Sequence, residues 1–515
     1  MTEDSLAERY PHRWWALGVL SLSLLIIGLD TTILNIALST LATDLDADNR
    51  DLQWITDSYI LVFAGLLLPA GAFGDRFGRK RVLIAGLVVF GVASVWCAWA
   101  PSADSLILAR ALMGLGAAVV TPLSLSLVPV MFTEQERSRA IAVWSVGMML
   151  GLPLGPLVGG WLLEHYWWGS VFLINVPFIA VALLAGGALV PETRDPAKPR
   201  VDYAGALLIT VGLAALVFGI IEGPNEGWSD PLIIGTLLGG AGLVVAFVLW
   251  ERRAAQPLID LSLFGNRRFT GATAVATAVS FTMFGVLFIV PQYLQVVLDN
   301  GTFGTGLRLL PLIVAFMLSA GVGDAMAKRL GPRATIAAGS VLLAGGLVYG
   351  AWSATTEGYG PIATAMTVMG LGLGLSLPTA MDVIVGELPE NRTGTGVALT
   401  MAVRQVAAAL GVALLGSLIA SVYDDRVSSV ADELGGEAGR IATDSVAGAA
   451  AVAARLDPST GERLREAAFD GFTDALAVSF WVCAATALAG ALAAAALLGR
   501  PRRRSPDRSR TTATL

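Results

Sequence analysis

The sequence predicts an all-α protein that crosses a membrane fourteen times, and three observations support this prediction. Of its 515 residues, 55% are hydrophobic and only 14% are charged, whereas a soluble protein carries about 25% charged residues. Fourteen apolar segments each approach or exceed the length of about 20 residues that a helix needs to cross the hydrocarbon core. Arginine and lysine are confined to alternate loops. Together these features indicate a polytopic membrane protein.

The expected spans fall into a 6+2+6 order along the chain. Six form a first group, two follow after a polar stretch, and six form a second group. In chain order the expected spans are 14–37, 53–74, 82–100, 105–130, 139–163, 170–190, 203–222, 231–250, 269–297, 304–326, 334–354, 360–386, 395–420 and 472–498.

Polar segments between the spans divide the chain into expected domains. These are an N-terminus at 1–13, a six-helix bundle at 14–190, two linker helices with their flanks at 191–268, a second bundle at 269–498 and a basic tail at 499–515.

The second bundle contains the one long external segment that we expect, at 421–471. This segment is acidic and rich in alanine, and its parts 441–455 and 461–470 can form amphipathic helices. Its role is either that of a solvated hairpin or that of an element for gating or for collecting substrate.

The distribution of basic residues predicts the orientation. The loop at 75–81 carries four basic residues, whereas the loops at 101–104 and 164–169 carry neither arginine nor lysine. Basic loops stay in the cytoplasm, so both termini are expected there because the number of spans is even. Only three of the 34 basic residues are lysine, a bias typical of GC-rich bacterial genomes. We therefore expect a bacterial cytoplasmic membrane protein.

Three charged residues lie inside expected spans of the first group. A charge near the bilayer centre costs about 2.5–3.5 kcal/mol, so each one suggests a function. Asp30, Asp57 and Arg110 lie at similar depth in the outer half and can share one layer. A carboxyl group between an arginine and apolar surroundings can load and release a proton. We expect these residues to couple transport to protons, with structural hydrogen bonding as the alternative.

The second group has its own buried charges. Asp324 and Asp382 lie near the inner ends of their spans, and Arg404 lies near the middle of the thirteenth. Arg404 is the deepest of these and must have a partner. Asp324 is a candidate for a second protonation or cationic-drug site. Asp382 is either a coupling residue or half of an ion pair at the inner surface.

The fifth span is rich in glycine and proline. Glycines at four-residue spacing form a flat stripe that lets another helix approach closely, and prolines bend the helix. The stripe predicts either tight packing alone or a role in transport. The residues are Gly147, Gly151, Pro153, Gly155, Pro156, Gly159 and Gly160.

The loop after the second span resembles a motif of the major facilitator superfamily of transporters. The resemblance implies the major facilitator fold. It also implies that Asp75 and Arg76 form a cytoplasmic latch that favours the outward-facing state. We expect Asp75 to begin the next helix, where it can interact with a positive helix end. The motif comprises Gly71, Asp75, Arg76, Gly78, Arg79 and Lys80.

Other motifs extend the resemblance to nearly the whole chain. The fifth span resembles the pattern of antiporters in this superfamily, and Arg110 with Gly114 matches a helix-4 motif linked to proton coupling. The sequence LDTTILNIAL around Asp30 and FLINVP at 172–177 resemble the fourteen-helix drug:proton antiporters. Asp57 and the long external segment are similar to features of exporters of quaternary ammonium compounds and dyes. The acidic pair that some such exporters carry on helix 13 is not evident here, which puts a preference for divalent cations in doubt.

The resemblance implies that the chain exports an amphipathic, cationic drug in exchange for protons, by alternating access between two bundles. The alternatives are a narrow exporter of one endogenous antibiotic or metabolite, and a membrane enzyme or sensor. Only two histidines are present and no G-x-x-x-x-G-K-[ST] loop occurs. We therefore expect no catalysis, no metal, no cofactor and no nucleic acid, and a monomer in the lipid bilayer.

The cargo is expected between the two bundles, among aromatic and methionine side chains. The candidate residues are Trp54, Met148, Phe281, Met283, Phe284, Gln292, Tyr293 and Arg404.

Overall fold

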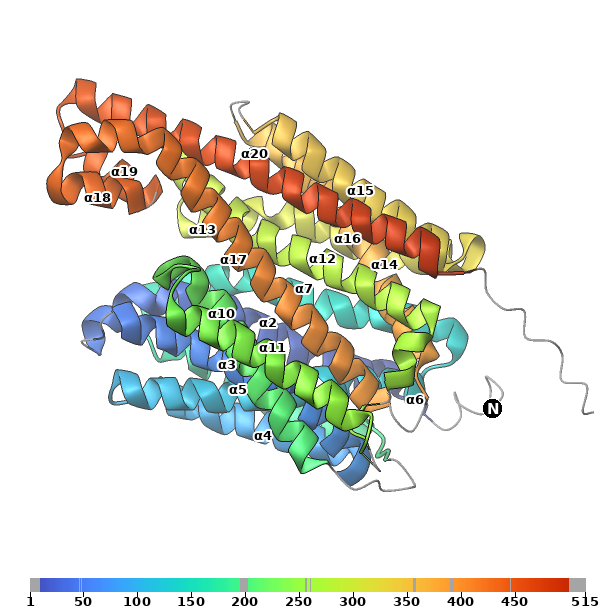
Figure 1. Cartoon of the computed structure of the whole chain (residues 1–515). Helices are drawn as coiled ribbons and strands as arrows, with labels where there is room; N and C mark the ends of the chain where they lie inside the picture. Colours follow the sequence, from blue (N-terminus) through green and yellow to red (C-terminus); the bar gives the residue numbers. More distant parts are fainter. Residues whose placement is uncertain are drawn as a thin grey trace, which may run out of the picture.

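The computed structural model describes residues 10–45, 47, 49–194, 202–254, 257–259, 261–354, 358–389, 393–444 and 446–499. In these ranges the regular structure is entirely helical. Thirteen of the helices within them are long and apolar enough to cross a membrane. The fourteenth expected span, 139–163, lies within the continuous 32-residue helix α7 (Glu134–His165). The structure therefore confirms an all-α membrane protein with fourteen long helices (Figure 1).

The first group of helices packs around pairs that are distant in sequence. Helix α2 packs along α7, and α3 packs along α5. The group consists of α2 (Arg13–Asp44), α3 (Asn49–Phe77), α4 (Arg79–Ala98), α5 (Ala103–Ser126), α6 (Val128–Met131), α7, α8 (Ser170–Leu173) and α9 (Asn175–Leu189).

The second group repeats this arrangement, with α12 packed along α17 and α14 packed along α16. It consists of α12 (Arg267–Gln292), η2 (Tyr293–Val297), α13 (Thr302–Arg308), α14 (Leu310–Leu330), α15 (Pro332–Trp352), α16 (Tyr359–Glu387), α17 (Thr393–Leu434), α18 (Gly436–Asp444), α19 (Val446–Ala453) and α20 (Pro458–Leu497), and it follows the short η1 (Leu261–Gly265).

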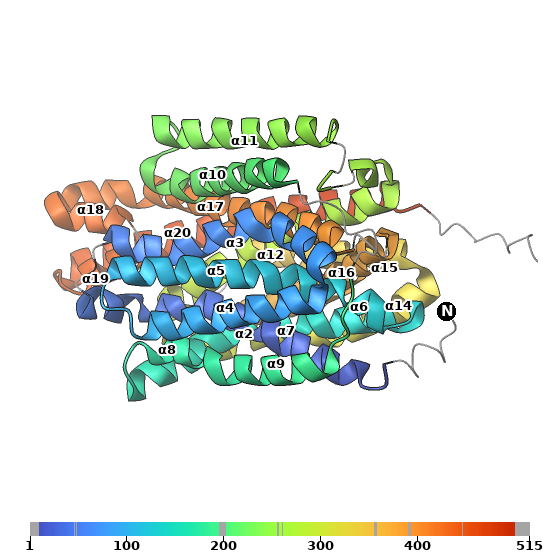
Figure 2. The same ribbon diagram turned by 90° about the horizontal axis from the view of Figure 1, so that it is seen from below.

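The two linker helices, α10 (Tyr203–Glu226) and α11 (Pro231–Glu251), pack against each other on one side of the molecule (Figure 2). Helix α10 contacts α3 of the first group and α17 of the second. Helix α10 thus touches both bundles, while the exact limits of the expected domains stay predictions.

The described residues of 421–471 are largely helical, as expected, but the helices on either side are longer than the expected spans. Helices α17 and α20 have 42 and 40 residues, so both continue well past the expected spans 395–420 and 472–498. Together with α18 and α19 they form a helical hairpin that projects beyond the bundles (Figure 1). The expected helix at 461–470 belongs to the first part of α20. The N-terminus of α20 is capped by Asp457, whose side chain accepts hydrogen bonds from the backbone nitrogens of Ser459 and Thr460.

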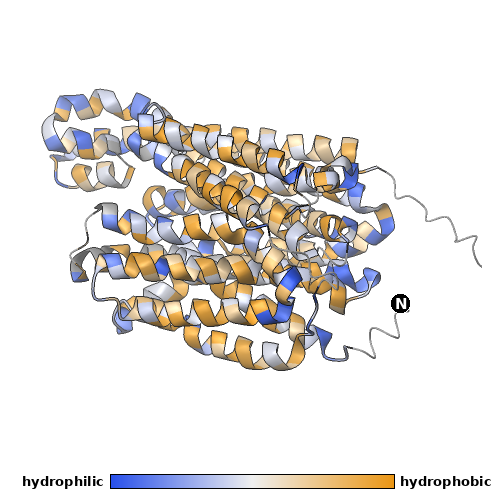
Figure 3. Cartoon of the chain, turned by 60° about the horizontal axis from the view of Figure 1, so that its bottom comes forward, coloured by the Kyte–Doolittle hydropathy of each residue, from blue (hydrophilic) through white to orange (hydrophobic). Residues whose placement is uncertain are grey.

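Hydropathy follows the shape expected for a chain in lipid. Apolar residues make up most of the length of the long helices, and hydrophilic residues gather toward their ends and in the hairpin that projects beyond the bundles (Figure 3). Large apolar side chains such as Leu184 and Trp352 are each 79% exposed, which lipid would cover.

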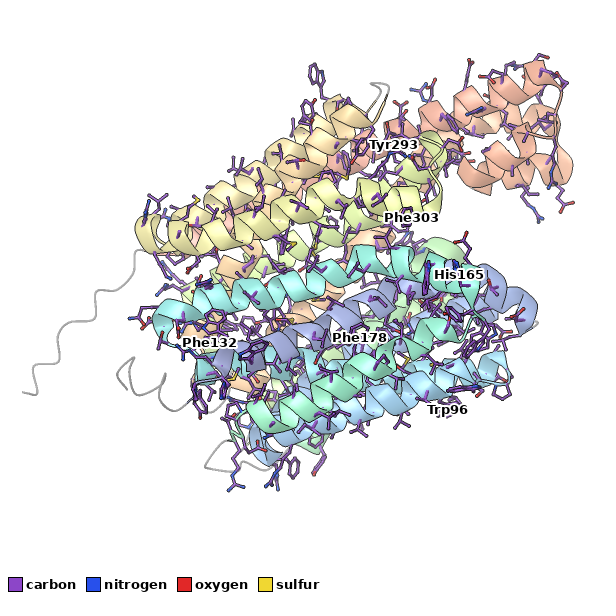
Figure 4. All side chains as sticks on the ribbon, turned by 180° about the vertical axis from the view of Figure 1, so that it is seen from behind. Trp96, Phe132, His165, Phe178, Tyr293 and Phe303 are labelled. Atoms are coloured by element: carbon purple, nitrogen blue, oxygen red, sulfur yellow. The ribbon has the colours of Figure 1, made fainter. Side chains whose placement is uncertain are left out.

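The long helices run between two ends of the molecule, the basic end and the far end. The basic end carries Arg79 and Lys80 at the start of α4. The far end is the opposite one, where His165 ends α7. Figure 4 shows Phe132 toward the basic end, and Trp96 and His165 toward the far end.

The glycine stripe of α7 lies against α2. A Cβ atom on Gly147 would lie 2.7 Å from the carbonyl oxygen of Ser21, and one on Gly151 would overlap the carbonyl oxygen of Leu25. Gly155 and Gly159 face α2 in the same way. The stripe therefore permits close packing of two helix backbones. The side chains of Pro153 and Pro156 lie outside the described part of α7.

Replacing Gly151 by Ala is expected to destabilise the protein by about 1–3 kcal/mol, because the new methyl group would meet fixed backbone atoms of α2. Gly160→Ala is the matched control, since a Cβ on Gly160 meets no atom within 4 Å. That change should be neutral or stabilise the helix by up to about 1 kcal/mol. Thermal unfolding of the purified variants in detergent checks both values, and equal midpoints would contradict the packing argument.

Candidate functional site

The most deeply buried ion pair of the first group joins α2 to α5. Arg110 Nη1 donates to Asp30 Oδ2 at 2.6 Å, and the two residues are 1% and 0% exposed. Arg110 Nε also donates to the carbonyl oxygen of Ile55 at 3.2 Å. The guanidinium lies 4.5 Å from the centre of the Tyr59 ring. The structure thus brings Asp30 and Arg110 together in one layer and holds the guanidinium from three directions.

Asn175 completes this cluster, and sequence reasoning missed its role. Its Nδ2 is 3.3 Å from both Asp30 Oδ1 and Ser94 Oγ, so each carboxylate oxygen of Asp30 has a donor. Asn175 is 1% exposed at the start of α9. An amide inside the apolar FLINVP segment was the available signal. We call Asp30, Arg110 and Asn175 the central charge cluster.

Asp57 lies outside this cluster and has a different partner. It is 7% exposed on α3, and its carboxyl group interacts with that of Glu222 on linker helix α10, also 7% exposed. Gln53 Nε2 donates to Glu222 Oε1 at 2.6 Å. Asp57 Oδ2 has no hydrogen-bond partner among the described residues. Two interacting buried carboxylates repel each other, and one shared proton stabilises the pair. Sequence reasoning missed Glu222, although an acid inside an apolar span was visible.

Glu222→Gln is expected to stabilise the protein by about 0.5–1.5 kcal/mol at high pH, because it removes the repulsion and offers Asp57 an amide donor. The gain should vanish at low pH, where the two acids hold a proton between them. Glu226→Gln is the matched control, since Glu226 is exposed on the same helix. Thermal unfolding of each variant across pH measures the effect. A gain independent of pH, or one shared by the control, would rule out the carboxyl pair.

A small cavity lies where α7 meets the second bundle. Its volume is about 20 Å³, enough for about one water molecule. Arg404 is its one ionisable lining residue among those described. The lining residues are Trp144, Ser145, Met148, Met149, Met283, Phe316, Leu377, Met381 and Arg404; we call this space the central cavity.

Three of the expected cargo residues line this cavity, namely Met148, Met283 and Arg404. Phe281 and Phe284 are not among its lining residues. They lie near Met283 on α12 but point in other directions, because successive residues of a helix point about 100° apart. The structure placed other side chains there that the sequence did not indicate. These are Trp144, Met149, Phe316, Leu377 and Met381.

The remaining expected cargo residues lie elsewhere. Trp54 stacks on Phe218 of α10, with ring centres 6.0 Å apart. Gln292 donates to the carbonyl oxygen of Phe288 on its own helix at 3.0 Å. Tyr293 lies toward the far end (Figure 4). Each was predicted from residue type, which does not determine the face or the depth of a side chain.

The loop motif forms a connection between the bundles at the basic end. Asp75 accepts hydrogen bonds from the backbone nitrogens of Gly394 and Thr395, at 3.1 and 2.9 Å, and from Thr395 Oγ1 at 3.0 Å. These atoms form the N-terminus of α17, where a carboxylate is favoured. Gly71 permits this contact, since a Cβ there would lie 2.6 Å from the carbonyl oxygen of Gly394.

One detail of the expected latch was wrong, namely the position of Asp75 in its helix. Arg79 of the same motif pairs with Asp75, with Nη2 and Oδ1 2.8 Å apart, and the guanidinium of Arg76 lies over the ring of Phe77. Asp75 belongs to the last turn of α3 rather than to the start of α4. The helix continues to Phe77 and stops at Gly78, whose φ of 112° favours glycine.

A second connection at the basic end joins Arg137 of α7 to Asp382 of α16, with Nε and Oδ1 2.7 Å apart. This agrees with the alternative that Asp382 forms an ion pair. Asp324 pairs with Lys328 at 2.9 Å on α14. Both acids line an open polar cavity of about 1030 Å³ at this end, distinct from the central cavity.

The bundles also meet near the far end, where α13 packs against α7. Trp228, between the two linker helices, donates to Ser417 of the second bundle at 2.9 Å. Contacts at both ends leave only about 20 Å³ in the central cavity, while sites for drug-sized ligands measure about 300–1,000 Å³. A ligand of that size would fit in this cavity only if the bundles separated at one end.

Comparisons with known proteins agree with this architecture. The model of the Major Facilitator Superfamily matches residues 20–412. The chain is 34% identical to the multidrug efflux pump LfrA of Mycolicibacterium smegmatis, over 94% of this chain and 96% of that protein. It is 32% identical to the tetracenomycin C resistance and export protein of Streptomyces glaucescens, over 96% and 93% of the two chains. The solved structure of the proton:xylose symporter XylE shares the fold, with a TM-score of 0.60, 14% identity and coverage of 94% and 95%.

Proposed function

The chain belongs to the Major Facilitator Superfamily, and from this premise we propose that it exports amphipathic small molecules across a bacterial cytoplasmic membrane in exchange for protons. It is thus a transporter, and its relatives include a multidrug efflux pump and an antibiotic resistance and export protein. We further propose that it acts as a monomer, without a cofactor.

The buried ion pair between Asp30 and Arg110 is the observation that supports proton coupling most directly. Protonation of Asp30 removes the negative charge that balances a fully buried arginine. The packing of α2 against α5 then depends on whether Asp30 carries a proton. Because α2 also packs along α7, and α7 lines the central cavity, a change at this pair can reach the cargo site.

In the proposed cycle the basic end faces the cytoplasm, with both termini on that side. The contacts of Asp75 and Arg137 then close the cytoplasmic side, and their release would open the central cavity to cargo. Rocking of the two bundles about this cavity gives alternating access. The membrane potential contributes about 2.3 kcal/mol per charge for each 100 mV.

Reconstitution into liposomes with an imposed pH gradient tests the proposal. Addition of a transported compound should accelerate proton flux, and the compound should accumulate against its gradient. A panel of drugs and antibiotics in an efflux-deficient bacterium then separates a broad exporter from a narrow one, since relatives of both descriptions occur. Transport without any proton flux would refute antiport.

The described lining of the central cavity bears on the charge of the cargo. The expectation of a cation came from the family resemblance, and Asp57 and Asp324 were the acids offered for it. Asp57 pairs with Glu222, and Asp324 lies at the basic end beside Lys328. Neither lines the central cavity. The described lining of that cavity therefore offers a cation no carboxylate.

A further inference from the structure

Arg404 is a buried cation without a carboxylate partner among the described residues. It is 7% exposed, and its Nε donates to Ser280 Oγ at 2.8 Å. Its Nη1 approaches only the sulfur atoms of Met381 and Met401, at 3.6 and 3.5 Å. Methionine sulfur is a weak acceptor, so one strong and neutral hydrogen bond supports the whole guanidinium.

The two arginines that are more deeply buried among the described residues, Arg79 and Arg110, are both paired with carboxylates. Arg79 lies 2.8 Å from Asp75. Arg110 is matched by the carboxylate of Asp30 at 2.6 Å. Asp324 and Asp382, which line the open polar cavity at the basic end, are already paired with Lys328 and Arg137. Arginine keeps its proton in proteins, and a buried charge is stable only when it is paired. The counter-charge for Arg404 must therefore come from outside the described residues.

The position of Arg404 indicates where that counter-charge binds. Arg404 lines the central cavity together with Met148, Met283, Phe316 and Trp144. These side chains come from both bundles, and they are apolar or present a large apolar surface. Methionine adapts to irregular apolar shapes, while a guanidinium offers a planar fork for two oxygen atoms. The cavity thus combines one oriented anion-binding group with an adaptable apolar lining.

We propose that the central cavity binds amphipathic organic anions, whose carboxylate or sulfonate oxygens accept hydrogen bonds from Arg404 while their apolar body lies among the methionines. This inference rests on the proposed transport function and names its substrate class. In the closed structure the cavity is small, so the anion would bind when the bundles separate.

Two ligands of matched shape and opposite charge provide the test. They are 1-pyrenebutyrate and its trimethylammonium counterpart, added to the purified full-length protein without any gradient. Energy transfer from tryptophan to pyrene reports binding, and the part lost in a Trp144→Phe variant reports occupancy of the central cavity. We expect the carboxylate to bind at least about tenfold more tightly than the ammonium compound, as a charged hydrogen bond allows.

Variants at Arg404 make the test specific. Arg404→Gln should weaken binding of the carboxylate about tenfold without weakening the ammonium ligand. Arg404→Lys should retain most of the affinity. Arg308→Gln is the control, because Arg308 lies over Tyr359 and outside the cavity. Tighter binding of the ammonium ligand to the wild type, or unchanged carboxylate affinity in a folded Arg404→Gln protein, would overturn the proposal.

The wild-type comparison needs no variant, so it decides the proposal even where Arg404→Gln fails to fold. It is also independent of the transport assay. Selective anion binding without proton flux would refute antiport and support the anion site. Proton-coupled transport of cations alone would support antiport and refute the anion site.

Discussion

Asp30→Asn is expected to abolish proton-coupled transport and to lower the free energy of unfolding by about 3–5 kcal/mol. The carboxylate is 0% exposed and is the one charged partner of Arg110 among the described residues. An amide at this position cannot carry the proton, and it leaves the guanidinium buried without a balancing charge. Liposome proton flux measures the first effect, and thermal unfolding in detergent measures the second.

A double variant separates the two effects. Asp30→Asn combined with Arg110→Gln removes both charges, so most of the lost stability should return while transport stays absent. Asp104→Asn is the matched control, since Asp104 is exposed in the first turn of α5, and it should transport like the wild type. Coupled transport in the double variant would remove Asp30 and Arg110 from the proton pathway.

Asp75→Asn is expected to open the basic end. The carboxylate accepts three hydrogen bonds from the start of α17 and pairs with Arg79. A loss of about 1–2 kcal/mol from these charge-assisted bonds would change the ratio of closed to open molecules about 5–30-fold. Distances between spin labels at positions 81 and 329, measured by double electron–electron resonance, should shift toward longer values.

The labelling design is favourable because Cys97 and Cys483 are both buried, so they should not compete with introduced cysteines. Glu433→Gln serves as the control. Its partner Arg463 and Glu433 itself are more than half exposed at the far end, and such pairs contribute little. An unchanged distance distribution in Asp75→Asn would show that other contacts, such as Arg137 with Asp382, close this end.

The sequence was sufficient for the fold because a membrane restricts the options strongly. Apolar length fixes the helices, since backbone groups in lipid must bond within their own segment. The glycine stripe of α7 even predicted a close neighbour, which proved to be α2. The ends of helices that extend beyond the membrane could not be predicted in this way, because backbone groups there can bond to water. The helices α17 and α20 continue into the external segment without an apolar pattern to announce it.

The candidate sites were only partly predictable. Depth along a helix could be counted, which placed Asp30 and Arg110 in one layer, but the partner of a side chain depends on which helices are neighbours. Asp57 therefore joined Glu222 of a linker helix instead of the central charge cluster. The sequence placed Asp75 at the start of the next helix, whereas α3 continues to Phe77 and Asp75 pairs with Arg79. The proton-coupling and cargo roles themselves stay predictions.

The hairpin at the far end has a mechanical consequence. Helix α17 has 42 residues, which makes it roughly 63 Å long, and its start lies at the basic end beside Asp75. If the second bundle rotates as a rigid body about its middle by roughly 10°, a tilt of the kind seen between rigid bodies in switching proteins, the turn at Gly435 would sweep through roughly 8 Å. A small rotation of the second bundle therefore moves the tip of the hairpin much farther than it moves the lining of the central cavity. A single probe at that tip can record the rotation.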